Sequence, residues 1–418
     1  MRYAFILGAL FAATTANAQW EIQPAPTTAD LRGIDNVGKG IVWASGSDGT
    51  VLRTTDDGAH WQLCPTPPDA EKLDFRGIQA FDANTAIVMS TGKGPLSRLY
   101  KTTDGCQTWK LVFTNPDPEG SWDTMQFYAP RFDLLGHRWD YSRSSGLVAG
   151  DPINGSFVIF QTFDGGNTWI RRQPRRRVGG DCKIDGVPAE YGEALFAAGN
   201  QSLVNFGGIP NFLIVSGGKV ARLLYTNESS WDGSFCHLSA STVGLPLASG
   251  NASTGAFAIA ATNANSYFPL RLMIVGGDYT KPEQAAGNAV FVASKAGFHL
   301  PFTSYFNVST PQTPPHGFRS AVAYDEAAKT WITVGPNGTD ISTDDGRNWR
   351  ALRPTPNEPA DADRDWNALS LPFVVGPHGR IGKLRPEALA PPKTPSSTRR
   401  KGTPKGASRR KISLQSIR

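Results

Sequence analysis

The sequence offers little material for metal or cofactor chemistry. Its four cysteines include no Cys-x-x-Cys pair and its six histidines do not cluster, so no zinc site is predicted. No dinucleotide-binding signature is present. Beyond the first 18 residues, no apolar run approaches the roughly 18 residues that a membrane-spanning helix needs. We therefore expect no cofactor, no metal and no transmembrane helix.

The first 18 residues have the pattern of a Sec signal peptide. Arg2 gives a positive start, the apolar run 5–13 is too short to span a bilayer, and residues 16–18 (Ala-Asn-Ala) supply the small residues of a cleavage site. We expect cleavage after Ala18 and a periplasmic or secreted location.

The positive charge of the chain is concentrated at its C-terminus. The whole chain has a formal net charge of +6, but residues 388–418 contain nine basic residues and no acidic one. The rest of the chain therefore has a net charge of −3, or −4 without Arg2. Because this basic tail has almost no apolar residues, we expect it to be disordered and to attach to an anionic envelope surface. We expect no specific recognition of nucleic acid.

One short pattern recurs along the chain, an apolar run that ends in glycine. Its seven copies lie 41 to 67 residues apart and end at Gly46, Gly92, Gly150, Gly217, Gly276, Gly335 and Gly376. Short β-branched runs bounded by turns predict buried strands. Segments such as 31–34, 75–78 and 194–198 precede these copies, and their small residues suit the crowded centre of a ring of sheets. We expect them to form the innermost strands.

A second pattern, Thr/Ser-x-Asp-x-Gly/Cys-x-x-Trp, follows four of these copies. Its members are Asp56, Gly58, Trp61, Asp104, Trp109, Asp164, Gly166, Trp169, Asp344, Gly346 and Trp349. The carboxylate can accept backbone N–H groups within a turn, glycine supplies positive φ, and tryptophan packs beneath. The pattern resembles the Asp-box, or bacterial neuraminidase repeat. Because Asp-boxes are structural, we assign these residues no catalytic role.

The repeats predict an all-β fold, a seven-bladed β-propeller of four-stranded blades. The last blade has only three strands, within residues 366–384, and residues 19–24 have the sequence of the missing fourth strand. We expect this N-terminal strand to close the last blade and to remove an open sheet edge. The predicted organisation is a signal peptide at 1–18, a monomeric propeller at 19–387 and the basic tail at 388–418.

The four cysteines permit two disulfides in an oxidising compartment, with three possible connectivities. Cys182 and Cys236 both flank the fourth blade, so we pair them. This leaves Cys64 paired with Cys106, on the first and second blades.

Three arginines share one repeat position, at the inner strands of blades one, two and six: Arg32, Arg76 and Arg319. If their side chains point to the axis, they form a positive arc whose guanidinium forks suit carboxylate or phosphate groups. The alternative is structural pairing with neighbours such as Asp35 or Asp74. Loops held by a rigid ring supply further binding candidates, namely Arg138, Asp278 and Tyr279.

Longer segments resemble the photosystem II stability/assembly factor family and its non-photosynthetic bacterial relatives. They are Leu-Arg-Gly-Ile at 31–34, residues 49–61, Gly-Gly-Asp-Tyr at 276–279, Phe-Arg-Ser-Ala-Val at 318–322, and residues 338–349. In that family the propeller is a non-catalytic platform whose arginine-rich surface engages a partner protein. The resemblance implies the same role here, with Arg32, Arg76 and Arg319 at the matching positions.

The favoured function is therefore a binding platform for a protein partner or an anionic ligand at the axis. The alternative is a glycoside hydrolase, because sialidases share the Asp-box and hold a carboxylate with three arginines. A glycosidase needs two carboxyl groups flanking the scissile bond. Asp151, Glu193 and Asp278 are candidates, but nothing in the sequence pairs them, and the Phe-Arg-Ile-Pro motif usual in sialidases is absent.

Overall fold

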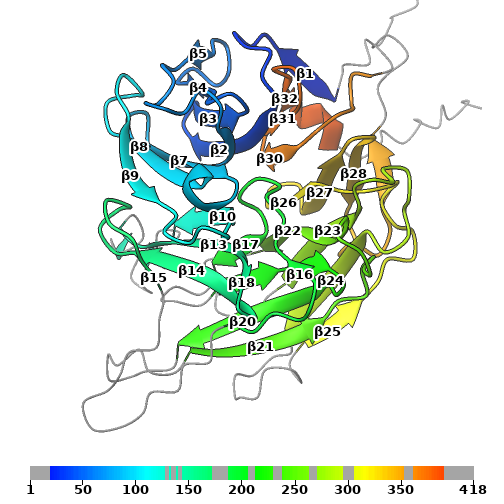
Figure 1. Cartoon of the computed structure of the whole chain (residues 1–418). Helices are drawn as coiled ribbons and strands as arrows, with labels where there is room; N and C mark the ends of the chain where they lie inside the picture. The colour runs from blue at the N-terminus through cyan, green and yellow to red at the C-terminus, as the bar shows by residue number, and fades with distance from the viewer. Residues whose placement is uncertain are drawn as a thin grey trace, which may run out of the picture.

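The computed structural model describes residues 19–127, 131–132, 138–139, 144–171, 187–205, 212–228, 238–262, 271–294, 306–352 and 361–389. Within them, antiparallel sheets are arranged as seven blades around a central axis, as Figure 1 shows. The chain is thus an all-β, seven-bladed propeller, as the repeats predict. No helix in the described ranges is long and apolar enough to cross a membrane.

The strands of blades 1 to 4 follow one another from the axis to the rim. Blade 1 contains β2 (Leu31–Gly38), β3 (Ile41–Gly46), β4 (Val51–Thr54) and β5 (Gln62–Leu63). Blade 2 contains β6 (Asp74–Ala80), β7 (Ala86–Thr91), β8 (Arg98–Thr102) and β9 (Lys110–Thr114). Blade 3 contains β10 (Trp122–Phe127), β13 (Gly146–Ile153), β14 (Ser156–Thr162) and β15 (Ile170–Arg171). Blade 4 contains β17 (Leu203–Asn205), β18 (Phe212–Val215), β20 (Arg222–Glu228) and β21 (Leu238–Gly244).

Blades 5 and 6 repeat this order, and blade 7 completes it with the N-terminal strand. Blade 5 contains β22 (Thr254–Thr262), β23 (Arg271–Asp278), β24 (Ala289–Ser294) and β25 (Phe306–Ser309), with β19 (Gly217–Gly218) and β16 (Glu193–Ala194) added at its inner edge. Blade 6 contains β26 (Ala321–Asp325), β27 (Thr330–Gly335), β28 (Gly338–Ser342) and β29 (Arg350–Leu352). Blade 7 contains β30 (Ala368–Ser370), β31 (Phe373–Val375), β32 (Ile381–Leu384) and β1 (Trp20–Gln23). A hairpin of β11 (Arg131–Phe132) and β12 (Arg138–Trp139) and the 3₁₀ turns η1 (Gly94–Leu96) and η4 (Pro386–Leu389) complete the elements.

The N-terminal strand closes the ring, as expected. β1 pairs antiparallel with β32, from Trp20 opposite Leu384 to Gln23 opposite Ile381, and Figure 1 shows the first and last strands together in this blade. Trp20 is 2% exposed, and its indole N–H donates to the Thr339 hydroxyl of blade 6 at 2.9 Å. The first strand therefore joins blade 7 by its backbone and blade 6 by its side chain.

Four turns between third and fourth strands contain the same hydrogen bonds. In blade 1 the Thr54 hydroxyl donates to Asp56 at 2.8 Å and accepts the Gly58 N–H at 3.1 Å, while Asp56 accepts the His60 N–H at 2.9 Å. Equivalent bonds occur in the turns that contain Asp104, Asp164 and Asp344. The hydrogen bonds from His60 lower the pKa of Asp56 to about 2. Each carboxylate is thus committed to its own turn.

The tryptophan that ends each of these turns packs against the preceding blade. The Trp61 ring lies 6.2 Å from Phe373 of blade 7, and the Trp109 ring lies 6.5 Å from Trp43 of blade 1. Trp169 belongs to the same buried cluster as residues of blade 2, and Trp349 belongs to a cluster with blade 5. The repeated motif therefore fixes the turn and also joins neighbouring blades.

A disulfide joins Cys64 to Cys106 and so links blade 1 to blade 2. Cys106 occupies the turn position that is Gly58 in blade 1, Gly166 in blade 3 and Gly346 in blade 6. Its φ is +62°, and the three glycines have φ of +85°, +82° and +71°. The cysteine therefore holds a left-handed backbone conformation that glycine adopts without a steric cost.

The structure corrects one strand assignment. Residues 194–198 do not form the inner strand of blade 4, because that strand is β17 (Leu203–Asn205). The small residues 197–199 suit the centre of the ring as well as an inner strand does, and they lie across the axis. The sequence pattern alone cannot separate these two placements.

Several predictions concern residues outside the described ranges. They include the signal peptide, the Cys182–Cys236 pairing and the basic tail beyond Leu389, and the side chain of Arg138 is likewise not described. The predicted start of the tail does lie within the described chain. Ala388 and Leu389 belong to η4 and pack against the cluster that contains Trp20 and Trp366, so the packed part of the chain reaches Leu389.

Ring closure can be tested with two substitutions in the same strand. Replacing Trp20 with Ala removes a buried ring and its hydrogen bond, and should lower the free energy of unfolding by about 3–5 kcal/mol. Ile22 lies in the same strand but is 47% exposed, so Ile22→Ala should change it by no more than about 0.5 kcal/mol. Urea unfolding of the mature chain measures both. Equal effects would show that β1 contributes only its backbone.

The left-handed backbone at Cys106 makes a second prediction. Both Cys64→Ala/Cys106→Ala and Cys64→Ala/Cys106→Gly remove the cross-link, which costs about 2–4 kcal/mol. The glycine variant should nevertheless be more stable than the alanine variant by about 1 kcal/mol. Urea unfolding compares the pair, with the oxidised wild-type chain as reference. An alanine variant as stable as the glycine variant would contradict the assigned conformation.

Candidate ligand-binding face

The centre of the ring is filled by the chain itself. Residues 196–201, here called the axial segment, follow β16 and cross the axis before β17. The Asn200 side chain donates to the Ile78 carbonyl of blade 2, and its backbone carbonyl accepts the Thr124 hydroxyl of blade 3 at 3.1 Å. Gln201 donates to the Leu369 carbonyl of blade 7 at 2.6 Å. The axis is therefore a packed region of the structure.

Further bonds of Gln201 complete this arrangement. Its side-chain carbonyl accepts the Val322 N–H of blade 6 at 3.1 Å, and its backbone carbonyl accepts the Ile259 N–H of blade 5 at 2.7 Å. Gly199 lies so close to blade 1 that an added Cβ would be 3.3 Å from the Arg32 carbonyl oxygen. The axial segment thus contacts six of the seven inner strands, and it holds their spacing.

Polar side chains also link neighbouring inner strands where these strands end. The links are Asn36 to Leu371 and Ser370, Asp35 to Gln79 and Ala80, Gln79 to Phe127, and Gln126 to Asn205. Burial raises the pKa of Asp35 to about 7, despite the two hydrogen bonds that it accepts. These links join blades 7 and 1, 1 and 2, 2 and 3, and 3 and 4 at the ends of their inner strands.

Arg32 and Arg76 lie together around Asp74, on the face where the inner strands begin. Arg76 Nε donates to Asp74 Oδ2 at 2.8 Å, and its Nη1 donates to the Ala197 carbonyl of the axial segment at 3.2 Å. Within the described residues, Arg32 makes longer ion pairs, 3.4 Å to Asp74 and 3.6 Å to Asp30. The two arginine side chains are 31% and 32% exposed. The structure thus shows the alternative for these two residues, because both arginines pair with Asp74.

Arg319 does not belong to this exposed pair, which corrects the expected arc of three arginines. Its side chain is fully buried and donates to the carbonyls of Gly317, Gly338 and His316 and to the Asn337 side chain. An ion pair to Asp340 at 3.2 Å completes its surroundings. With its guanidinium committed in this way, Arg319 holds together the loops at the start of blade 6 and has no donor facing solvent.

His316 belongs to the same network and has two acceptors. Its Nδ1 lies 2.7 Å from Asp340 Oδ2, and its Nε2 lies 2.7 Å from the Asn337 carbonyl. Both partners only accept, so both ring nitrogens must carry a proton to satisfy them. The hydrogen bond to Asp340 raises the pKa of His316, against the effects of partial burial and of nearby Arg319.

The carboxyl groups considered for glycoside hydrolysis are committed to other partners. The Glu193 carboxylate is fully buried and bonds Arg222, the Ser216 hydroxyl and the Glu190 N–H. Asp151 accepts the Leu195 N–H at 3.1 Å. Burial raises the pKa of Asp151, and burial with the neighbouring Asp151 charge raises that of Asp123 well above its usual range. The bond from Asp151 thus holds Leu195, the residue that precedes Phe196.

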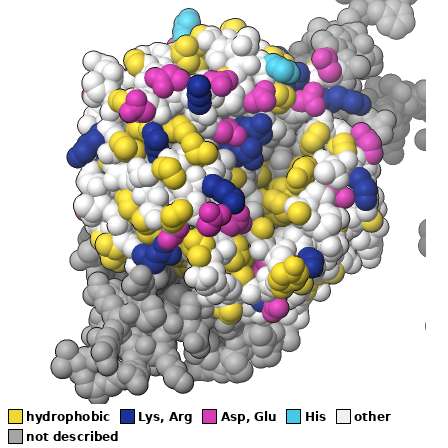
Figure 2. Space-filling view, viewed as in Figure 1, with side chains coloured by type: hydrophobic (Ala, Val, Ile, Leu, Met, Phe, Trp, Pro, Cys, Tyr) yellow, Lys and Arg dark blue, Asp and Glu magenta, His cyan; other side chains and the backbone are white. Residues whose placement is uncertain are grey.

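An aromatic cluster lies beside the axial segment on blades 5 and 6. The Phe196 and Phe257 rings stack with centroids 3.9 Å apart, and Phe318 meets Phe257 edge-on at 4.7 Å. Tyr279 contacts Phe257 at 6.1 Å and remains 52% exposed. The adjacent Asp278 is only 3% exposed and accepts bonds from Ser253 and Thr280. On the face shown in Figure 2, basic and acidic side chains are intermixed near the centre.

Solved structures show what this architecture resembles. No known protein family matches the sequence, and no curated protein is similar to it. The structure described as "YCF48 bound to D1 peptide" has a TM-score of 0.53 at 14% identity, over 88% of this chain and 96% of that chain. The chain shares the fold of YCF48.

Two further structures extend this comparison. YCF48 from Cyanidioschyzon merolae has a TM-score of 0.50 at 17% identity, over 88% of this chain and 99% of that chain. An ancestral GH74 enzyme has a TM-score of 0.48 at 12% identity, over 87% of this chain and 46% of that chain. The similarity to the photosystem II assembly factor that the motifs indicate is thus confirmed at the level of the fold.

Sequence reasoning missed the axial segment, which sets this YCF48-like propeller's central geometry. The available signal was the pair Asn200-Gln201, which follows the small residues 197–199 and departs from the apolar pattern of an inner strand. Two long amides at the end of such a run can bond backbone groups of several neighbouring strands.

Because His316 lies between two hydrogen-bond acceptors, the free energy of unfolding should depend on pH. The folded-state pKa of His316 lies above its unfolded value of about 6.5, so its stabilising effect is complete below about pH 6.5 and is lost as pH rises through the folded pKa. His316→Asn should therefore cost about 1 kcal/mol near pH 6 and less at pH 9. Urea unfolding of both proteins across this range measures the difference, and a difference that does not change with pH would contradict the assigned protonation.

Proposed function

We propose that this chain is a non-catalytic, exported propeller that binds an acidic segment of another protein on the face that carries Arg32 and Arg76. The export signal in residues 1–18 supports a periplasmic or secreted location. The fold supports the role of a platform, since a propeller of the same fold, YCF48, is described as bound to a D1 peptide.

The contacts of Arg32 are the observation that carries this proposal. Arg76 is tied to Asp74 by a 2.8 Å bond and to the axial segment by another. Among the residues that the structure describes, Arg32 has ion pairs of 3.4 and 3.6 Å only, and its side chain is about one-third exposed. A carboxylate from a partner can therefore bind its planar fork at shorter distances. Asp74 would remain paired with Arg76.

The filled axis supports a face-binding mode over an axial one. A ligand cannot enter the centre, because the axial segment occupies it through bonds to blades 2, 3, 5, 6 and 7. A peptide can instead lie across the rigid face, with Arg32 meeting an acidic group and Tyr279, which is 52% exposed, meeting apolar side chains. A tyrosine at such a surface contributes a large contact area at small entropic cost.

Peptide display on the folded mature chain tests the proposal. Selected peptides should contain Asp, Glu or a free C-terminal carboxylate, and Arg32→Ala should weaken their binding about tenfold, the effect of one bond to a charged group. Arg32→Lys should also weaken binding, because the charge remains but the fork geometry is lost.

Arg347→Ala is the matched control. Arg347 is exposed in the turn between β28 and β29, at the opposite end of the blades from the start of β2, and this variant should bind as the wild type does. Acidic peptides that bind Arg32→Ala as tightly as the wild type would overturn the proposal. Steady release of sugar from glycans by the purified chain would replace it with the glycoside hydrolase alternative.

A further inference from the structure

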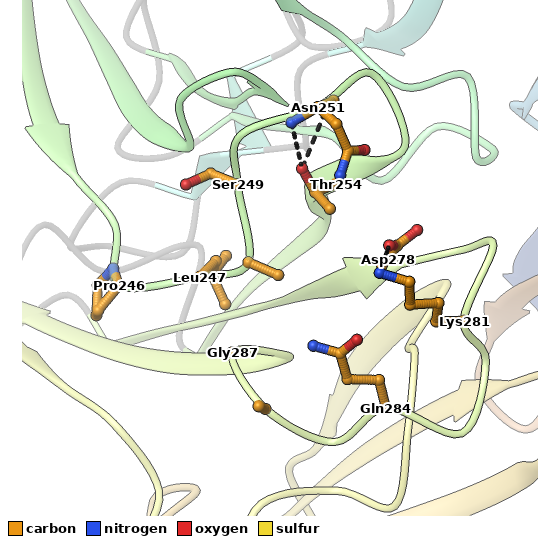
Figure 3. Close-up of a pocket in the computed structure, with 11 residues that line it drawn as sticks. Pro246, Leu247, Ser249, Asn251, Thr254, Asp278, Lys281, Gln284 and Gly287 are labelled. Carbon is orange, nitrogen blue, oxygen red and sulfur yellow. Dashed lines mark hydrogen bonds and ion pairs between the residues drawn. The ribbon is translucent and has the colours of Figure 1, made fainter.

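A pocket separate from Arg32 and Arg76 lies between blades 4 and 5. It has a volume of about 380 Å³, which is in the range of sites that hold one amino-acid side chain or a small ligand. Two loops form it, the connection 245–253 that leads into β22 and the loop 279–288 between β23 and β24. Figure 3 shows Leu247 and Pro246 on one side and Asp278 with Lys281 on the other.

The loops that form this pocket are held by specific backbone contacts. Ala248 N–H donates to the Gly287 carbonyl at 2.8 Å, and Gly250 N–H donates to the Gly218 carbonyl at 3.0 Å. An added Cβ on Gly287 would lie 2.6 Å from Ala248 N, so the two loops approach closely at that point. The Thr254 hydroxyl donates to the Asn251 carbonyl and accepts the Asn251 N–H. Figure 3 shows these two bonds, which hold the end of the 245–253 connection in place. The pocket is therefore a built feature of the blade.

The buried end of this pocket carries a permanent negative charge. Asp278 is 3% exposed, and its Oδ1 accepts bonds from the Thr280 hydroxyl at 2.6 Å, the Ser253 hydroxyl at 2.7 Å and the Thr280 N–H at 3.0 Å. These bonds, led by the one from Thr280, lower the pKa of Asp278 to about 2. The carboxylate is ionised under all ordinary conditions.

The second oxygen of Asp278 is far less engaged. Its Oδ2 has one ion pair in the described structure, to Lys281 Nζ at 3.5 Å, and the Lys281 side chain is 64% exposed. A lysine in this position can swing into water at small cost, because exposed ion pairs contribute little. The same oxygen is then open to a better-placed donor that enters the pocket.

The rest of the lining suits a long cationic side chain. Pro246, Leu247 and Ala286 give apolar surface along which methylene groups can pack. Gln284 adds an amide group, and Figure 3 shows this amide turned toward the pocket. An anionic ligand would instead have to approach the ionised Asp278 while its only compensating charge is an exposed lysine.

We propose that this pocket binds a basic side chain, lysine or arginine, of a protein segment, with Asp278 Oδ2 as the acceptor and with Lys281 displaced into solvent. The proposal does not depend on the Arg32 site, although both lie on the face where inner strands begin. If one partner occupies both sites, it carries both an acidic and a basic group.

Saturation-transfer NMR and calorimetry with small probes test this pocket. Nα-acetyl-arginine amide and Nα-acetyl-lysine amide should bind the mature chain, while Nα-acetyl-norleucine amide, which has the stem without the charge, should bind at least about tenfold more weakly. Asp278→Asn should cause a similar loss for the arginine probe. Lys281→Gln should tighten binding about two- to fivefold by removing the competing ammonium.

Two further variants separate the possible failures. Ala286→Trp fills the pocket from an exposed loop position without altering Asp278, and should abolish probe binding even if Asp278→Asn disturbs the loop. Arg32→Ala should leave probe binding unchanged, so that this proposal and the proposed function can fail independently. Equal binding of norleucine, preferential binding of Nα-acetyl-glutamate amide, or full binding to Ala286→Trp would each overturn the assignment.

Discussion

The pairing of the first strand with the last blade is the constraint on which the rest of the structure depends. β1 joins β32 along its whole length, and Trp20 reaches across to Thr339 in blade 6. Each blade packs its sheet faces against the adjacent blades. An open ring would therefore expose the two faces that now meet where the ring closes, and also the free edge of β32. Closure fixes the circumference, and the circumference fixes the distances across the axis. The axial segment can bond inner strands on opposite sides only because those distances are set.

The blades contact one another at three distances from the axis. At the rim-side turns, Trp61, Trp109, Trp169 and Trp349 pack against the preceding blades, and the Cys64–Cys106 disulfide adds a covalent link. At the inner strands, amide and carboxyl side chains join successive blades. At the centre, Asn200 and Gln201 do the same across the ring. Loops on the face are thereby held by a rigid frame, which is the usual setting of a binding site.

Because the axial segment fills the centre of the ring, the candidate binding residues lie on the face of the propeller and not in a central channel. A central positive arc would have required three exposed arginines, but Arg319 is buried and only Arg32 keeps loosely held donors. Blade 5 has the complementary arrangement, in which Asp278 is ionised and Lys281 is its only partner at Oδ2 within the described residues. The same face thus carries a loosely held arginine and an ionised aspartate, with exposed Tyr279 next to Asp278 in the sequence. The chain shares the fold of YCF48, and Arg32, Asp278 and Lys281 determine the charge on this face.

Much of this protein follows from local sequence. The seven glycine-ended strands, the four Asp-containing turns and the closing N-terminal strand could be predicted, because each depends on a short pattern of burial and turn geometry that repeats. The inner strand of blade 4 could not, because residues 194–198 satisfy the composition of an inner strand and that of a segment crossing the axis. Arg32, Arg76 and Arg319 share a repeat position, yet their surroundings decide their exposure. Asn337, Gly338 and Asp340 enclose Arg319, whereas the Arg32 side chain is 31% exposed. The repeat position determines where a residue lies on the backbone of its blade. The partners of its side chain come from segments that are distant in sequence, and these segments meet only in the closed ring.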